Sequence, residues 1–145
     1  MRPGRMVSTA IVDSGALIAA ANSADPAHHA CLETLQAPGV HLVIPALCVA
    51  EAAYLLQRRA GAQVEARFLR GLESFDVQAP RPEDWPRIAE LVERYADLPL
   101  GGTDASVVAL AERLATDRVI TLDRRHFSAV KPLHCDHLRL LPDLA

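Results

Sequence analysis

The sequence predicts an α/β fold, a three-layer α/β/α sandwich in which helices cover both faces of a central, mostly parallel sheet. Short β-rich runs alternate with longer segments of helical periodicity along all 145 residues. Parallel strands need such crossovers, which are right-handed and place helices on the faces of the sheet. A chain of this length buries about 68–70% of the surface that its unfolded form exposes, so one core suffices. We therefore expect a single domain over residues 1–145.

The first half of the chain contains two expected strands and four expected helices. Proline marks two helix starts, at Pro26 and Pro45, and glycine marks two helix ends, at Pro38-Gly39 and Gly61. The strands are the apolar runs TAIV and HLVI. In order, we expect a strand over 9–12, a helix from 14, a helix over 26–37, a strand over 41–44, and helices over 46–59 and 62–73.

The second half opens on a possible short strand, FDVQ. Pro82 begins the next helix, and Pro86 still lies in its first turn, where the missing N–H costs little. The loop LPLGG separates this helix from the segment TDASVVALAERLA. In order, we expect a strand over 75–78, helices over 82–97 and 103–115, a strand over 118–122, a polar turn, and a last strand over 137–141.

Charge and cysteine content limit the possible functions. The formal net charge is −3, so any contact with nucleic acid needs a local basic patch. Cys31, Cys48 and Cys135 have unrelated spacings, which indicates neither a disulfide framework nor a CxxC metal site and favours the reducing cytoplasm. No apolar run approaches the roughly 20 residues needed to cross a bilayer, so we expect no membrane partner.

Two acidic residues follow expected strands directly. Asp13 comes after residues 9–12, and Asp123 comes after residues 118–122. Ligand sites of parallel sheets form beyond the carboxyl ends of the strands, and both acids would emerge at that edge. Either residue alone is also explained as a turn or N-cap aspartate.

Two further acids lie on expected helices, beside apolar positions. The neighbours of Glu51 at three and four residues are Leu47, Cys48, Tyr54 and Leu55, and a carboxylate in such a stripe is costly unless it is paired or bound to a cation. Arg58 is a possible partner. Asp104 opens its helix beside Val107 and Val108, where an acid also complements the helix dipole. Asp97 either joins these acids or ends the preceding helix.

Four carboxylates at one place repel one another and acquire raised pKa values unless a cation lies between them. Mg²⁺ and Mn²⁺ are hard ions suited to carboxylate ligands, and Mg²⁺ binds readily beside phosphates. Such ions generate a hydroxide nucleophile and stabilise the leaving oxygen of a phosphodiester. The acids therefore predict a metal-dependent phosphodiesterase, with neither a histidine nor a cysteine nucleophile.

Four segments together resemble the PIN-domain family, and specifically the VapC toxins of bacterial toxin–antitoxin pairs. They are IVDSGALIA, PALCVAEAAYLL, DLPLGGTDASVVALAERL and VITLDRRHF, and they extend from Asp13 to Phe127. The resemblance assigns catalytic and metal-binding roles to Asp13, Glu51, Asp104 and Asp123. It also matches Ser14 to the small hydroxyl residue that follows the first acid, and we expect Asp123 to be the outermost of the four acids.

This resemblance implies an endoribonuclease that depends on Mg²⁺, with Mn²⁺ able to substitute, and that cuts structured RNA such as tRNA or rRNA. It also implies inhibition by a cognate VapB-like antitoxin that covers the active site, and either a homodimer or a larger toxin–antitoxin assembly. The helices over 46–73 are rich in small and apolar residues and are our candidate antitoxin-binding surface.

Other interpretations stay open. A PIN-like module that is catalytically silent and only binds a partner or RNA would keep the same fold. The clusters HHAC at His28 and HCDH at His134 are possible zinc ligands, although their spacing matches no recognised finger. Arg124 and Arg125 either steer a phosphate toward the metal or are solvated turn residues.

Overall fold

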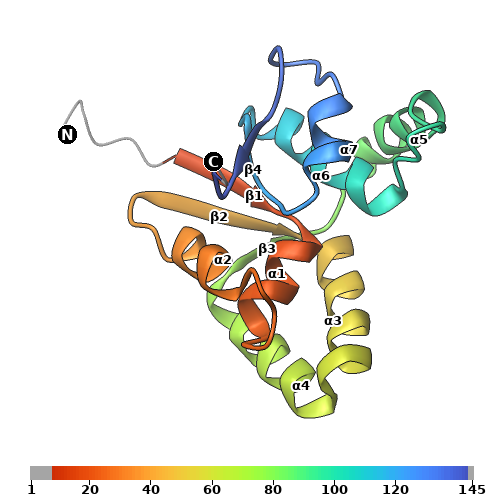
Figure 1. The fold of residues 1–145 in the computed structure, drawn as a ribbon. Coiled ribbons are helices and arrows are strands. Elements are labelled where there is room, and N and C mark those ends of the chain that lie inside the picture. The colour runs from red at the N-terminus through yellow and green to blue at the C-terminus, as the bar shows by residue number, and fades with distance from the viewer. Residues whose placement is uncertain (1–7, 144–145) are drawn as a thin grey trace.

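The computed structural model describes residues 8–143, in which five parallel strands form one sheet with the order β3-β2-β1-β4-β5 (Figure 1). The predicted domain limits, residues 1 and 145, lie outside this range. The strands are β1 (Ser8–Val12), β2 (Val40–Pro45), β3 (Asp76–Gln78), β4 (Arg118–Ile120) and β5 (Arg139–Leu141). The α-helices are α1 (Ser14–Ala21), α2 (His28–Leu35), α3 (Ala46–Ala60), α4 (Ala62–Gly71), α5 (Asp84–Arg94), α6 (Gly102–Arg113) and α7 (Arg124–Ala129), with a 3₁₀ turn at Leu72–Ser74.

The helices lie in two layers around the sheet. Figure 1 shows α1, α2 and α4 on one side and α5, α6 and α7 on the other, while α3 extends away from the carboxyl end of β2. All four strand pairings are parallel, so the α/β prediction is confirmed and the sheet is more regular than "mostly parallel". The chain leaves β1 toward β2 on one side and later returns to β4 on the other, so the direction of winding changes at β1.

The core is centred on β1 and α6. Ala10, Ile11 and Val12 are fully buried because β1 has a strand on each side and helices on both faces. In α6, seven consecutive residues from Ala105 to Ala111 are buried, since this helix packs against β1, β2, β4, α3 and α5. Asp13, which directly follows β1, and Asp104, which lies on α6, are thus both attached to the buried core of the molecule.

Most predicted elements are confirmed, and their boundaries follow from local signals. Gly61 has a φ of +92° and ends α3, as predicted, because this left-handed backbone favours glycine. Pro86 lies in the first turn of α5, where it removes no helical hydrogen bond. Within residues 8–143 no helix is long and apolar enough to cross a bilayer.

The expected polar turn after residue 122 is wrong. The segment RRHFSA forms helix α7, whose N-cap is Asp123, and the strand before it ends at Ile120. Asp123 accepts a hydrogen bond from the backbone N–H of His126, and Phe127 anchors the helix as a fully buried side chain. A cap and one apolar anchor are therefore enough to make a helix from a charged segment.

Candidate active site

Asp13 lies at the centre of the carboxyl edge of the sheet, one residue beyond β1. Its backbone N–H donates to the carbonyl of Ile120 at 2.9 Å, which extends the pairing of β1 with β4. Its carboxylate accepts hydrogen bonds of 2.8 Å from the backbone N–H of Ser14 and from Oγ1 of Thr121. The first of these bonds caps α1. Only 3% of the residue is exposed, so this acid has almost no rotational freedom.

Burial raises the pKa of Asp13 above its usual range. The hydrogen bonds from Thr121 and Ser14 oppose this shift, while the charges of Glu51 and Asp123 add to it. A buried carboxylate near two other acids is unfavourable without a cation. The hydrogen-bond donors around Asp13 therefore hold its geometry but do not remove the electrostatic cost of its charge.

Glu51 reaches the same locus from α3. Ser14 Oγ lies between the first two acids, 3.0 Å from Glu51 Oε1 and 3.4 Å from Asp13 Oδ1, and its single proton is shared between these two acceptors. The predicted apolar stripe around Glu51 is wrong, because the buried residues of α3 are Cys48, Ala52 and Leu56. Glu51 itself is exposed and is the outermost of the four acids, which corrects the expectation for Asp123.

The neighbours predicted for Glu51 have other roles. Tyr54 is 60% exposed, and Arg58 stacks over its ring at 5.6 Å while donating a hydrogen bond to its hydroxyl. No ion pair joins Arg58 to Glu51 within residues 8–143. The carboxylate of Glu51 is thus held near Asp13 by Ser14, without neutralisation by an arginine.

Asp104 lies in the first turn of α6, partly buried. Burial, followed by the charges of Asp13 and Asp123, raises its pKa to about 6; Glu51 adds to the rise and His126 lowers it. All four predicted acids therefore interact electrostatically at one place. Asp97 does not join them, since it is an exposed turn residue between α5 and α6.

Asp123 completes the cluster from the opposite side of β1. Its backbone N–H donates to Thr121 Oγ1 at 2.9 Å, and the same hydroxyl donates to Asp13. The fully buried Thr121 therefore fixes the first and fourth acids relative to each other. Nothing in the sequence singled out this threonine except its position two residues before Asp123.

His126 is the second residue that the sequence did not predict for the site. Its Nδ1 lies 2.5 Å from Asp123 Oδ2. Within residues 8–143, His126, Asp104 and Asp123 form the only group of three histidine, cysteine or acidic residues arranged to hold a metal ion, with ligand atoms within 4.8 Å of one another. Because α7 was expected to be a turn, the position of this ring could not be foreseen.

Arg124 and the two histidine–cysteine motifs are used for contacts within the fold. Arg124 donates to the backbone carbonyls of Leu140 and Pro142, so it fastens α7 to the C-terminal segment and is not free for a phosphate. Arg125 is exposed. His28 and His134 each contact a backbone carbonyl, and the zinc cluster is not formed within the part of the chain that the structure describes.

The site is well suited to a divalent cation. Four acids meet at the sheet edge, and within residues 8–143 no arginine or lysine forms an ion pair with any of them. The donors are carboxylate oxygens with one adjacent imidazole, a set that hard divalent ions accept. Burial and mutual repulsion favour occupation by such an ion.

Comparison with known proteins agrees with this geometry. The PIN domain profile matches residues 10–132. The chain is 34% identical over 134 residues to ribonuclease VapC26 of Mycobacterium tuberculosis (strain ATCC 25618 / H37Rv), covering 91% of this chain and 99% of that protein.

Two solved structures are similar in fold. VapC20 of M. tuberculosis, a Sarcin-Ricin loop cleaving toxin, has a TM-score of 0.76 at 18% identity, over 87% of this chain and 98% of that one. VapBC2 from Rickettsia felis, bound to a DNA fragment from their promoter, has a TM-score of 0.68 at 17% identity, over 92% of this chain and 99% of the matched one.

The chain therefore belongs to the PIN-domain family. Its similarity to VapC26 extends over nearly the whole of both sequences. Within the family it is of the VapC type, and the resemblance seen in the four sequence motifs is confirmed.

Proposed function

We propose that this chain, as a single PIN domain over residues 1–145, is a VapC-type endoribonuclease toxin that depends on a divalent metal ion. The observation that carries the proposal is the convergence of Asp13, Glu51, Asp104 and Asp123 at one sheet edge without an arginine or lysine ion pair in residues 8–143. The similarity to ribonuclease VapC26 supports RNA as the substrate class.

In this mechanism the four acids would hold Mg²⁺, for which Mn²⁺ would substitute. Such an ion would act as a Lewis acid that lowers the pKa of a water nucleophile and stabilises negative charge at the reacting phosphate. Thr121 and Ser14 keep the acids in place, because their hydroxyls bridge Asp13 to Asp123 and to Glu51. Little side-chain movement is then needed when the ion binds, which favours catalysis by a preorganised site.

Structured RNA, such as tRNA or rRNA, is the substrate that we propose. VapC20, which has the same fold, is a Sarcin-Ricin loop cleaving toxin. With a net charge of −3 the chain needs a local cation to receive RNA, and Arg125 is the exposed arginine nearest in sequence to Asp123. A cellular RNA substrate and three unpaired cysteines support the cytoplasm as the compartment.

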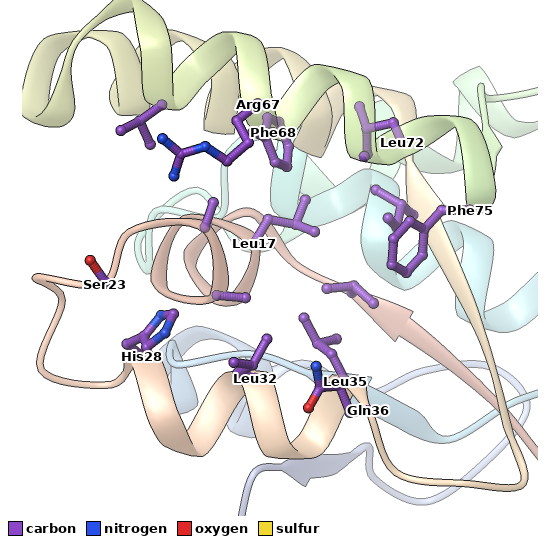
Figure 2. A pocket seen from close by; sticks show the side chains of 16 residues that line it. Leu17, Ser23, His28, Leu32, Leu35, Gln36, Arg67, Phe68, Leu72 and Phe75 are labelled. Carbon is purple, nitrogen blue, oxygen red and sulfur yellow. The ribbon is translucent and has the colours of Figure 1, made fainter.

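A VapB-like antitoxin is the proposed partner, and an apolar groove offers it a binding surface. The groove lies between α1, α2 and α4 and has a volume of about 450 Å³ (Figure 2). Leu17, Leu32 and Phe68 project into it from these three helices. This proposed surface differs from the expected one over 46–73: α4 lines the groove together with α1 and α2, and α3 does not line it.

The occupant that fits this groove is an amphipathic helix, which would cover an apolar face against Leu17 and Phe68. VapBC2 from R. felis supports a VapB-type partner for a chain of this fold. We further propose a homodimer, with a larger toxin–antitoxin assembly formed when the antitoxin binds. Phe68→Glu should abolish complex formation with the product of an adjacent antitoxin-like gene and leave RNA cleavage intact.

Cleavage assays with purified protein test the enzymatic proposal. RNA should be cut with Mg²⁺ or Mn²⁺, and cleavage should stop with EDTA and in the Asp13→Ala and Asp104→Ala variants. Metal-independent cleavage that survives both substitutions would contradict the mechanism. A catalytically silent binding module would instead cut nothing and would retain its partner in both variants.

A further inference from the structure

The four acids do not account for His126, the imidazole that lies against them. It belongs to α7, and 21% of its side chain is exposed. Its backbone N–H and its Nδ1 both contact the carboxylate of Asp123. The ring is therefore held at two points on the side of the cluster where Asp104 and Asp123 meet.

The Asp123 contact also shows which ring nitrogen faces the acids. Nδ1 lies 2.5 Å from Asp123 Oδ2, and two atoms this close are placed as adjacent ligands of one ion. Nε2 lies on the far side of the ring, and within residues 8–143 it has no hydrogen-bond partner. With an ion bound, the neutral ring would carry its proton on Nε2 and offer the lone pair of Nδ1 to the ion.

We propose that His126 is a nitrogen ligand which, with Asp104 and Asp123, forms a mixed imidazole–carboxylate site that selects transition-metal ions such as Mn²⁺ and Co²⁺ over Mg²⁺. This inference rests on the proposed metal-dependent function and adds a residue and an ion preference to it. The alternative is that His126 merely reinforces the N-terminus of α7.

The distances permit coordination after a small adjustment. One atom from each of the three residues lies within 4.8 Å of the others. Ligand atoms at about 2.1 Å from one ion are at most about 4.2 Å apart, so a closure of less than 1 Å is sufficient. Asp123 and Asp104 each supply a carboxylate and His126 a neutral nitrogen, which together balance a divalent charge.

The ligand type then decides the metal. Mg²⁺ prefers oxygen ligands in nearly ideal octahedral geometry and retains several waters. Nitrogen ligands favour first-row transition ions, with affinity rising from Mn²⁺ through Fe²⁺ and Co²⁺ to Ni²⁺. The opposite side of the cluster, at Asp13 and Glu51, has only oxygen ligands and is not expected to discriminate between Mg²⁺ and transition-metal ions.

Metal binding measured without RNA tests this proposal. Calorimetric titration of the wild-type chain with Mn²⁺, Co²⁺ and Mg²⁺ is compared with His126→Asn and with His29→Asn, an exposed histidine on α2. We expect His126→Asn to lose about tenfold or more in affinity for Mn²⁺ and Co²⁺, with Mg²⁺ changed by less than about twofold. His29→Asn should behave like the wild type. Equal losses for all three ions, or no loss, would overturn the proposal.

A second measurement needs no variant and so does not depend on the folding of His126→Asn. Pulsed electron paramagnetic resonance of the Mn²⁺-loaded wild-type chain should detect a directly coordinated ¹⁴N nucleus, and its absence rejects His126 as a ligand. The two proposals fail separately. Metal-dependent RNA cleavage without the nitrogen signal refutes only this inference, whereas the nitrogen signal without RNA cleavage refutes only the proposed function.

Discussion

The two ends of helix α6 differ in whether their acidic residues are paired with arginines. At the C-terminal end, Arg87 forms two hydrogen bonds of 2.8 Å with Glu112, and Arg113 binds Asp84 at 3.1 Å. At the N-terminal end, the charges of three further acids raise the pKa of Asp104, and the charge of His126 lowers it. Both ends are partly buried, so burial alone does not distinguish them.

The two ends differ in whether a basic side chain compensates the charge of each carboxylate. Glu112 raises the pKa of Arg87 because the two groups stabilise each other's charge. Burial and its acidic neighbours raise the pKa of Asp104, because within residues 8–143 it has no arginine or lysine partner and His126 compensates its charge only in part. The paired end connects α5 to α6 and stabilises the fold, whereas the unpaired end reduces stability until a cation binds. A clustering of acids without arginines is therefore the structural signature of the site.

The largest expected effect is on catalysis at the unpaired end. Asp13→Asn should reduce RNA cleavage by at least about a hundredfold. The metal ion would no longer be positioned correctly, and several kcal/mol of transition-state stabilisation would be lost. Rates are measured at saturating Mg²⁺ or Mn²⁺, well below the unfolding temperature. Glu112→Gln, the matched change at the paired end, should retain activity. Comparable losses in both variants would remove the functional distinction between the two ends.

The next effect is on stability at the paired end. Glu112→Gln should lower the free energy of unfolding by about 2 kcal/mol, because Arg87 is left partly buried without its main partner. Glu112 also accepts a hydrogen bond from the backbone N–H of Leu133, which adds to the loss. Urea denaturation at pH 7 measures the change. A loss below about 0.5 kcal/mol would show that the pair behaves like an ordinary surface salt bridge.

A smaller effect of opposite sign is expected at the unpaired end. The folded-state pKa of Asp104, about 6, exceeds the ordinary value of 3.8, so the folded protein binds the proton more tightly than the unfolded chain. Stability without metal should therefore fall as the pH rises from about 4 to about 6. Asp104→Asn removes this cost and should stabilise the metal-free protein by about 1 kcal/mol at pH 7, a value reduced for solvent screening.

The pH dependence provides the control for Asp104. The gain should be present above pH 6 and should vanish below about pH 4, where the carboxyl of the wild type is protonated in both states. Asp97→Asn, at an exposed position outside the cluster, should show neither effect. A loss of stability in Asp104→Asn at pH 7 would mean that its carboxylate is already compensated in the metal-free protein.

The positions of the acids followed from rules that hold before packing is known. Asp13 and Asp123 were expected at one edge because they follow strands of a parallel sheet, and strand order did not need to be known for this. Asp104 was expected at a helix start beside buried valines, and this is where it lies. Their roles as metal ligands stay a prediction until the variants are tested.

The sequence predictions were wrong where the helical phase of one residue, or a single N-cap, determines the local structure. Glu51 was placed in an apolar stripe, but Cys48, Ala52 and Leu56 face the core one position away in helical phase, so Glu51 faces outward. The helix α7 was missed because its signals were only a capping aspartate and one buried phenylalanine. Since His126 depends on that helix, its place beside Asp104 required the three-dimensional structure.

The strand order determines when the acidic site can form during synthesis of the chain. Asp13 and Thr121 are 108 residues apart in sequence, and Asp13 receives its hydrogen bond only after β4 has paired with β1. Proteins fold from the N-terminus as they emerge from the ribosome, and contacts of such long range form late. A nascent chain that has not yet released β4 lacks Asp123 and the support for Asp13. The acidic site of the proposed ribonuclease is therefore complete only after Thr121 and Asp123 have left the ribosome.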